Sequence, residues 1–345
     1  MHGGTRREEL EGVSRDTLSD VLRAVRLRGA VFYYIDGSSP WMAEAPPARE
    51  TIPAIMPGAD HMIEFHGVVE GSCWAAIVGE PPLRLDERDV ILFPHGDPHV
   101  ISSAPGMRPQ RVDKEIYFAP RPPQLPYALS LRGSELTTAR LDGGGGDRTI
   151  LVCGFLGLDV RPFNPLVAAL PRILHLPASR ASDWVARVID QAVVESNNKR
   201  PGGEAVLERL SEMMFVDAAR RYLDSLPEDA TGWLAGLRDR YVGKALGLMH
   251  ERPDHAWSVD DLAREVGLSR SALHERFVQY LGQPPMQYLA SWRIQLGARM
   301  LRESNRNVAT IALDVGYESE AAFSRAFKRM VSMPPAAWRK AQAGA

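Results

Sequence analysis

The sequence VDDLAREVGLSRSALHERF (residues 259–277) decides the fold of the C-terminal part of this chain, together with VATIALDVGYESEAAFSRAFKRM (residues 308–330). Each stretch shows the pattern of an amphipathic helix, a glycine, a short polar turn and a second amphipathic helix. One such stretch is a weak signal, but two in matching register are a strong one. They predict two helix-turn-helix units, at about 259–280 and 308–331, in an all-α domain that binds DNA.

Glycine and serine stand at equivalent positions in the two units. Gly267 and Gly316 follow the first helix of each unit, and glycine ends a helix at little cost because it adopts the left-handed conformation. Ser269 and Ser319 precede the second helix, where a serine side chain caps free backbone N–H groups. These four residues predict where each turn lies.

Length and composition indicate a multidomain globular protein. The chain has 345 residues, of which 45% are hydrophobic, so two or three domains with hydrophobic cores are expected. It has neither 18 consecutive apolar residues nor an N-terminal apolar segment of the secretory kind, and two cysteines fit a reducing compartment. We expect a cytoplasmic protein without a membrane partner, associated with the nucleoid when it binds DNA.

Charge is distributed unevenly along the chain. From Arg240 to the C-terminus there are 15 Lys and Arg against 10 Asp and Glu, whereas the rest of the chain has 26 against 33. A basic C-terminal module suits contact with DNA phosphates. Because an excess of this size also occurs on ordinary solvated surfaces, the motifs carry the argument for DNA.

Three consecutive domains are expected from the pattern of apolar residues. Residues 1–160 contain short aromatic and branched runs, such as MIEFHGVV, DVILFPHG, KEIYFAP and TILVCGFL, which predict the strands of a small β-barrel. Residues 161–232 have helical periodicity and predict a helical linker, and residues 233–345 are helical to the end. The fold class is therefore multidomain α+β.

The helical linker carries an apolar stripe that predicts a dimerisation segment, and hence a homodimer. The alternative is that the stripe packs the helices onto the barrel within one chain. At helical spacing the stripe consists of Leu207, Leu210, Met214, Val216 and Ala219.

A further predicted helix, at residues 286–303, joins the two helix-turn-helix units. At 1.5 Å per residue it would be about 27 Å long. One turn of B-DNA is about 34 Å. A helix of this length could hold two recognition helices in successive major grooves on one face of the DNA.

Residues 233–339 resemble the DNA-binding domain of the AraC/XylS family of bacterial transcription regulators. This resemblance implies a regulator that binds double-stranded promoter DNA, in most of the family an activator that contacts RNA polymerase. The family's pattern is matched almost position for position by Gly316, Tyr317, Ser319, Phe323, Arg325, Phe327, Lys328, Arg329, Pro334, Pro335, Trp338 and Arg339.

The resemblance also implies which side chains face DNA. Arg325 is the best candidate for a base contact, because a guanidinium pairs bidentately with guanine; the alternative is an ion pair within the module. Arg276, Lys328 and Arg329 are expected to face phosphate or water. The full set of expected DNA-binding residues is Arg270, Ser271, His274, Glu275, Glu320, Ala321, Ser324, Arg325 and Lys328.

Residues 1–160 resemble the cupin-type effector domain of one branch of that family, through EFHGVVEGSCW and DVILFPHGDPHVISS. Pro94, Gly96 and His99 match the second half of the cupin metal motif. Glu64 stands seven positions before Gly71, as the family's glutamate should, but no HxH precedes it. The resemblance therefore implies a small-molecule or redox effector without an enzyme's three-histidine metal centre.

His66, His99 and Cys153 form a different candidate set on predicted strands of the barrel. Two imidazoles and a thiolate would suit Zn or Cu, and a thiolate would be sensitive to oxidation. The alternative is two satisfied core histidines and a buried cysteine that acts as a small hydrophobe. No cofactor is required, and a disulfide between Cys153 and Cys73 is a further alternative.

The expected function is sequence-specific, ligand-responsive regulation of transcription rather than catalysis. An alternative is a cupin oxygenase or isomerase with a DNA-binding appendage. The sequence contains no G-x-S-x-G, no P-loop and no H-E-x-x-H to support it. A purely architectural DNA binder would leave the predicted barrel unexplained.

Overall fold

A computed structural model describes the chain as two compact units. One unit consists of residues 26–159 and 170–225, and the other of residues 1–25, 160–169 and 226–345. These units divide the chain differently from the three consecutive domains expected from the sequence. The residues that the structure describes are 16–109, 115–118, 127–138, 146–178, 183–198 and 201–343.

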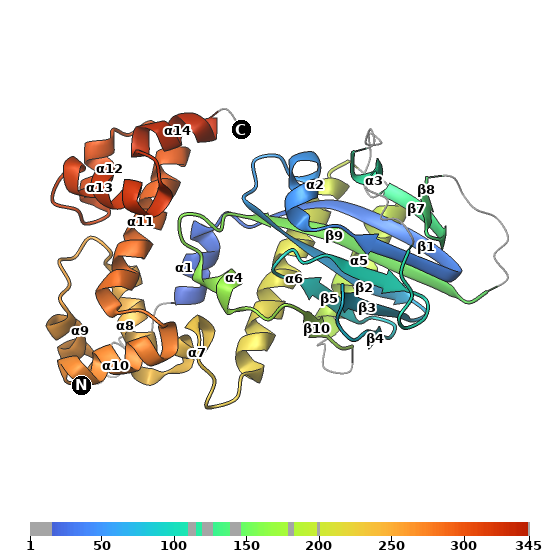
Figure 1. Cartoon of the computed structure of the whole chain (residues 1–345), viewed down its shortest axis with the longest axis horizontal. Helices are drawn as coiled ribbons and strands as arrows, with labels where there is room; N and C mark the ends of the chain where they lie inside the picture. Colours follow the sequence, from blue (N-terminus) through green and yellow to red (C-terminus); the bar gives the residue numbers. More distant parts are fainter. Residues whose placement is uncertain are drawn as a thin grey trace, which may run out of the picture. The chain divides into compact units, whose positions relative to one another are not determined.

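The first unit is built on a ten-stranded sheet (Figure 1). Its strands are β1 (Arg28–Ala45), β2 (His61–Glu70), β3 (Cys73–Ile77), β4 (Leu83–Leu85), β5 (Val90–Phe93), β6 (His99–Ser102), β7 (Tyr127–Gly133), β8 (Glu135–Thr137), β9 (Arg148–Leu158) and β10 (Leu174–Leu176). Their order is β10-β5-β2-β9-β1-β6-β3-β4, with β7 and β8 branching from β1. Among the described strands, β7 and β1 form a parallel pair and the other neighbouring strands pair antiparallel.

The long strand β1 curls the sheet around a hydrophobic core. Its first part pairs with β9 and β7, its last part pairs with β6, and the register shifts between Ser38 and Trp41. Trp41, Phe93 and Phe155 are almost fully buried inside the curl. Because β10 and β4 remain at the edges, the expected barrel is a cupin-like half-barrel rather than a closed one.

Two long helices, α5 (Asp183–Asn198) and α6 (Gly203–Ser225), pack on β1, β2 and β9. Side chains alternate along a strand, so Phe65 and Gly67 of β2 face these helices while their neighbours face the interior. The predicted apolar stripe on α6 is used in this contact: Leu207, Met214 and Ala219 are buried, and Leu210 and Val216 are half-buried. The stripe therefore packs within one chain, as in the alternative interpretation, and no longer argues for a dimer.

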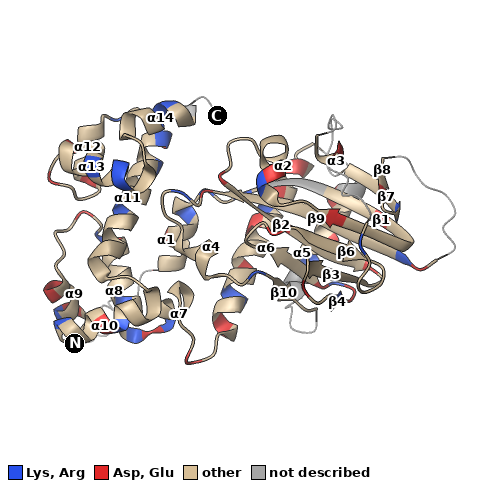
Figure 2. Cartoon of the chain, in the orientation of Figure 1, with Lys and Arg blue, Asp and Glu red and all other residues tan. Residues whose placement is uncertain are grey.

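The second unit is helical. Its main elements are α7 (Trp233–Arg238), α8 (Arg240–Glu251), α9 (Val259–Val266), α10 (Arg270–Leu281), α11 (Pro285–Glu303), α12 (Val308–Asp314), α13 (Glu320–Val331) and α14 (Pro335–Ala343). Figure 2 shows Lys and Arg on α11, α13 and α14 of this unit. The long helix α11 contacts α10, α12, α13 and α14 and so forms the centre of the module.

Helix α1 (Thr17–Ala24) and residues 160–169, with the short α4 (Pro165–Ala169), belong to this helical unit. Gln295 of α11 is only 1% exposed, and its side chain forms hydrogen bonds with both segments. Its Nε2 donates to the carbonyl of Ala24 at 3.2 Å, and its Oε1 accepts from the N–H of Phe163 at 3.0 Å. One buried amide thus ties two segments, remote in sequence, to the helix between the helix-turn-helix units.

Two expectations about secondary structure are wrong. KEIYFAP was expected to be a strand, but its described residues form one helical turn, α3 (Glu115–Phe118). Residues 174–176 were expected to be helical, but they form β10 and pair with β5. Short apolar runs do not separate strand from helix by periodicity, so pairing partners decide. The remaining helix of the sheet unit is α2 (Ala48–Ile55).

None of the described helices is long and apolar enough to cross a membrane.

Candidate DNA interface and effector pocket

The first helix-turn-helix unit consists of α9 and α10. A capping box starts α9: Ser258 Oγ accepts from the N–H of Asp261 at 3.1 Å, and the Asp261 carboxylate accepts from the N–H of Ser258. Gly267 ends α9 in the left-handed conformation, with φ 82°. Ser269 Oγ then accepts from the N–H of Ala272 at 3.2 Å and caps α10. The predicted glycine turn and serine cap are confirmed.

The second unit, α12 and α13, repeats this geometry. Ser319 Oγ accepts from the N–H of Ala322 at 3.2 Å and caps α13. Gly316 has φ +87°, and a Cβ there would lie 2.7 Å from Asp254 Cα and 2.8 Å from Pro253 O. Both the backbone conformation and this close approach require glycine.

Helix α11 holds the two units together through tight packing. Its 19 residues make it about 28 Å long. A Cβ at Gly297 would lie 2.7 Å from Phe323 Cζ, so α13 packs directly on the α11 backbone. Phe323, Phe327 and Trp338 share one core with Ile294 of α11. The position of α13 is therefore set by the centre of the module.

Each second helix buries one face and exposes the other. Leu273 and Phe277 of α10 and Phe323 and Phe327 of α13 are buried. The residues expected to face DNA lie on the other side: Arg270, Ser271, His274, Glu275, Glu320, Ala321, Arg325 and Lys328 are exposed, and Ser324 is half-buried. They are accessible, and their contact with DNA stays a prediction.

Ion pairs distinguish the arginines of this surface. Arg325 forms no ion pair with any residue that the structure describes, so its guanidinium is available to a base. Arg270 lies 3.3 Å from Asp260, and both side chains are largely exposed, so this pair is weak. The guanidinium of Arg276 binds the carboxylate of Asp239, and its contact with phosphate or water stays a prediction.

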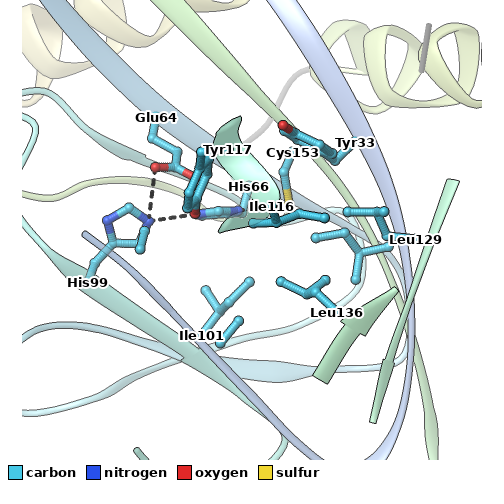
Figure 3. A pocket seen from close by; sticks show the side chains of 13 residues that line it. Tyr33, Glu64, His66, His99, Ile101, Ile116, Tyr117, Leu129, Leu136 and Cys153 are labelled. Carbon is cyan, nitrogen blue, oxygen red and sulfur yellow. Dashed lines mark hydrogen bonds and ion pairs between the residues drawn. The ribbon is translucent and has the colours of Figure 1, made fainter. Parts of the chain in front are cut away.

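A pocket inside the half-barrel gathers all four predicted effector residues (Figure 3). Glu64 and His66 project from the same face of β2, His99 begins β6, and Cys153 lies on β9. All four side chains are buried. The cavity volume is about 40 Å³, which is room for about three water molecules.

A chain of hydrogen bonds connects the polar groups of the pocket. His99 Nδ1 lies 3.0 Å from the carbonyl of Asp97, which only accepts, so this nitrogen carries the proton. His99 Nε2 therefore accepts from His66 Nε2 at 2.8 Å. His66 Nδ1, 2.8 Å from Cys153 Sγ, is then left to accept from the thiol. The order of donors is Cys153, His66, His99.

Burial keeps these groups uncharged. Burial raises the pKa of Glu64 to about 8 and lowers the pKa of His99 to about 4, although the carbonyl of Asp97 opposes the latter shift. Burial, and then the neighbouring His99, lowers the pKa of His66 well below its ordinary value. Burial also raises the pKa of the Cys153 thiol. At neutral pH, Cys153 is a thiol rather than a reactive thiolate.

The arrangement separates Cys153 from the other three residues. Glu64, His66 and His99 each place one possible ligand atom within 4.8 Å of the other two. These atoms are a carboxylate oxygen of Glu64 and the Nε2 atoms of the two histidines. Cys153 instead contacts Nδ1, on the other side of the His66 ring. The group that could hold a cation is thus two imidazoles and a carboxylate, rather than the two imidazoles and thiolate considered from the sequence.

The sequence did not identify the apolar half of the pocket. The alternation of side chains along β1 and β7 could have suggested that Tyr33 and Leu129 face the pocket. Ile116 and Tyr117 could not be found in this way, because their segment was expected to be a strand and forms the helical turn α3. The apolar lining consists of Tyr33, Ile35, Ala43, Ala45, Ile101, Ile116, Tyr117, Leu129 and Leu136.

The loop before β6 fixes His99. Gly96 has φ +66°, and a Cβ there would lie 2.7 Å from the Cβ of Ala48 on α2. The ring of His99 stacks on Phe93 at 3.7 Å between centroids. The predicted Pro-x-Gly-x-x-His pattern therefore lies where it aims the His99 ring into the pocket.

Two protein families match the chain. Residues 16–224 match a family described as Cupin, and residues 262–341 match one described as Helix-turn-helix domain. The first match covers most of the sheet unit together with α1 and α4, and the second runs from within α9 to within α14.

Curated relatives match almost the whole chain. A putative AraC-like transcription regulator of Streptomyces lividans is 34% identical over 94% of this chain and 98% of its own length. The transcriptional regulator AlkR of Acinetobacter baylyi is 25% identical over 94% of this chain and 99% of its own length. A solved AraC-type DNA-binding domain from Chromobacterium violaceum is 29% identical over 30% of this chain and 92% of its own length, with a TM-score of 0.29.

Proposed function

This chain belongs to the AraC family of transcription regulators, and from that premise we propose that it places α10 and α13 in successive major grooves of promoter DNA in response to an effector. The observation that carries this proposal is the pair of exposed second helices, both packed on the stiff helix α11. At about 28 Å, α11 approaches the ~34 Å turn of B-DNA.

The proposed reading of DNA differs between the two helices. Arg325 supplies a bidentate contact to guanine, and Ala321 leaves room for the methyl group of thymine. Ser271 and His274 of α10 offer short polar contacts to base edges. Lys328 contacts phosphate and contributes affinity without sequence preference.

We also propose the partners that regulation requires. Activation would proceed by contact with RNA polymerase in the cytoplasm, where the genome lies. A homodimer would form through apolar side chains that the sheet unit leaves exposed on neighbouring helices, namely Val194 of α5, and Val206 and Met213 of α6, which are 41%, 39% and 50% exposed. The effector would bind in the pocket around His66, because buried polar groups converge there.

Genome-wide mapping of bound DNA tests the proposal, with wild type, Arg325→Ala and Lys328→Ala in parallel. Wild type should occupy a few sharp sites. Arg325→Ala should lose sequence preference, at about 1–3 kcal/mol for the lost base contact. Lys328→Ala should weaken binding evenly across sequences and reduce the salt dependence by about one phosphate contact.

The matched pair of variants separates base reading from phosphate contact. Both residues are exposed on α13, and neither contributes to the core. If Arg325→Ala retained the wild-type sites and sequence preference, α13 would not read bases as proposed. Diffuse binding by wild type itself would contradict sequence-specific regulation.

A further inference from the structure

We propose that Arg293 of α11 fixes the separation and orientation of the two helix-turn-helix units, and thereby the spacing between the two DNA segments that they recognise. Arg293 is a positioning residue that acts without touching DNA. The inference rests on the proposed function, in which α10 and α13 enter successive major grooves, and it names what makes the module selective for the distance between them. The contacts that carry it join α11, the loop at residues 252–257 and the turn at Gly316.

The two units pack on different parts of α11. Near the start of this helix, Tyr288 is fully buried, and its ring lies 5.9 Å from that of Phe277 on α10. Towards the end of the helix, Gly297 meets Phe323 of α13. If α11 were the only connection, bending of this helix between the two contacts would move one recognition helix relative to the other. Arg293 lies between these two contacts in the sequence of α11.

The guanidinium of Arg293 ties α11 to the loop that leads into the first unit. Its Nε donates to the carbonyl of Pro253 at 2.6 Å, and its Nη2 donates to the carbonyl of His255 at 2.7 Å. Two donors on one planar group fix both the distance and the direction of the contact. Because the loop continues through the cap residue Ser258 into α9, these bonds fix where α9 begins relative to α11.

The loop at residues 252–257 is braced by its own side chains. Trp257 is buried, and its Nε1 donates to the carbonyl of Arg252 at 3.0 Å. The guanidinium carbon of Arg252 lies 4.7 Å from the centre of the Trp257 ring, and the ring of His255 meets the same side chain edge-on at 4.4 Å between centroids. A loop held in this way passes the position of α11 on to α9 instead of yielding.

The same loop and the same arginine also meet the turn of the second unit. A Cβ at Gly316 would lie 2.7 Å from Asp254 Cα and 2.8 Å from Pro253 O. It would also lie 2.8 Å from Nη2 of Arg293. The backbone of Gly316 therefore lies directly against the loop and the guanidinium. Arg293 and the loop before α9 thus contact the turn before α13, which is a second connection between the units besides α11.

Arg293 also interacts electrostatically with a residue on each side of this junction. Burial lowers the pKa of Arg293, and Tyr317 of the second unit and Asp254 of the loop oppose that shift. Burial raises the pKa of Tyr317, and Arg293 is the first of the charges that oppose this shift. Because an arginine stays protonated in proteins, the connection persists at every pH at which DNA binding is measured.

A fixed connection makes the module selective for the distance between the two DNA segments. One inserted base pair moves the second segment by about 3.4 Å and rotates it by about 35° around the DNA axis. A rigid module cannot follow this displacement, so it gives up the contacts of one recognition helix. The loss of one bidentate base contact alone corresponds to about 5- to 150-fold in affinity. A module without the Arg293 contacts follows part of the displacement and loses less.

Binding to DNA of altered spacing tests the inference with the full-length protein. Hydroxyl-radical footprinting on a mapped genomic site locates the two protected segments, and altered sites carry one base pair inserted or deleted between them. Wild type should bind the altered sites at least about 30-fold more weakly than the natural site. Arg293→Ala should lose at most about fivefold between the natural and the altered sites.

Two further variants separate positioning from charge and from general effects on the helix. Arg293→Lys keeps the charge but lacks the planar pair of donors that two carbonyls require, so it should relax the spacing preference as Arg293→Ala does. Arg299→Ala is the matched control, because Arg299 lies on the same helix and bonds Glu303 of that helix, and it should keep the wild-type preference. Thermal melting verifies that each variant is folded at the temperature of the binding assay.

The outcomes distinguish failure of this inference from failure of the proposed function. An equal loss of affinity by Arg293→Ala on natural and altered sites would show that Arg293 only stabilises the fold, and would overturn the inference. A wild-type spacing preference in folded Arg293→Lys would overturn the role of the paired donors. A wild type that protects only one segment, or that ignores the spacing, would instead contradict the proposed docking in two grooves.

Discussion

Replacing Gln295 by alanine should loosen α1 and residues 160–169 from the helical unit. The side chain is 1% exposed and makes two hydrogen bonds, to the carbonyl of Ala24 and from the N–H of Phe163. Each neutral hydrogen bond contributes about 0.5–1.5 kcal/mol, and leaving a buried partner unsatisfied costs more. We expect a loss of about 2–3 kcal/mol in the free energy of local opening.

Hydrogen exchange of the backbone amides in the two segments measures this loss. Since about 1.4 kcal/mol corresponds to a factor of ten, exchange of protected amides in α1 should accelerate by about 30- to 140-fold. Gln287→Ala is the matched control, because Gln287 is an exposed glutamine on the same helix, and it should change exchange by less than about threefold. Equal exchange in the two variants would refute the role assigned to the Gln295 amide.

DNA affinity provides an independent readout. Gln295 is buried, so its substitution removes no side chain from the exposed faces of α10 and α13. Affinity for a mapped site should therefore change little. In the sequence, α1 leads directly into β1 and β9 leads directly into residues 160–169. The response to an effector should therefore weaken much more than DNA binding itself.

Three further predictions concern stability and reactivity. Asp239→Ala should cost about 2 kcal/mol, because the carboxylate caps α8 and binds Arg276. Burial alone would raise the pKa of Asp239, but hydrogen bonds from Arg276 and two backbone N–H groups lower it below 3.8. The stability that the Asp239 carboxylate contributes is therefore full above about pH 4 and is lost as the pH falls through the lowered pKa. When the unfolding free energy is measured at decreasing pH, the value for wild type should converge on that for Asp239→Ala. Gly316→Ala should lower the free energy of unfolding by about 2 kcal/mol or more, since the added methyl group meets backbone atoms and the residue is in the left-handed conformation. Gly282→Ala is the control, because Gly282 has φ +68° but open space around it, and it should cost only about 1 kcal/mol. Equal melting temperatures of the two variants would contradict the close approach at Gly316. The buried thiols of Cys73 and Cys153 should not react with a disulfide reagent until the sheet unit unfolds. Burial excludes the reagent and raises the pKa of both thiols, that of Cys73 to about 12. Rapid labelling of the folded protein would show that the two thiols are not kept buried.

The helical module was predictable because its signals are local. A glycine in the left-handed conformation and a serine N-cap act within a few residues, so Gly267, Ser269 and Ser319 could be placed from spacing alone. The family resemblance implied which side chains of α13 face outward, and the structure buries Phe323 and Phe327 on the opposite face of this amphipathic helix. The partner of Arg276 could not be predicted, because Asp239 lies 37 positions earlier and meets it only after α8 and α10 have packed.

The effector pocket depended much more on tertiary structure. The sequence identified Glu64, His66, His99 and Cys153 as candidates but could not order them, because their contacts join β2, β6 and β9. Register decides that His66 lies opposite Cys153, and ring orientation decides that Nδ1 rather than Nε2 meets the thiol. Cys153 therefore lies on the opposite side of the His66 ring from His99.

By itself, the sequence determined that this chain has two helix-turn-helix units, which faces of their second helices are exposed, and which polar residues could serve the effector domain. The two units follow from local backbone preferences and from the period of 3.6 residues. The outward-facing side chains were implied by the family resemblance, and the effector candidates by the cupin motif and by residue types on the predicted strands. Only the tertiary structure decided that the α6 stripe packs on the sheet and that Gln295 joins α1 to residues 160–169. It also decided that the carboxyl group of Glu64 and the imidazoles of His66 and His99 lie within 4.8 Å of one another. Those outcomes depend on which remote segments come into contact, and that is set by packing and strand register rather than by any local pattern.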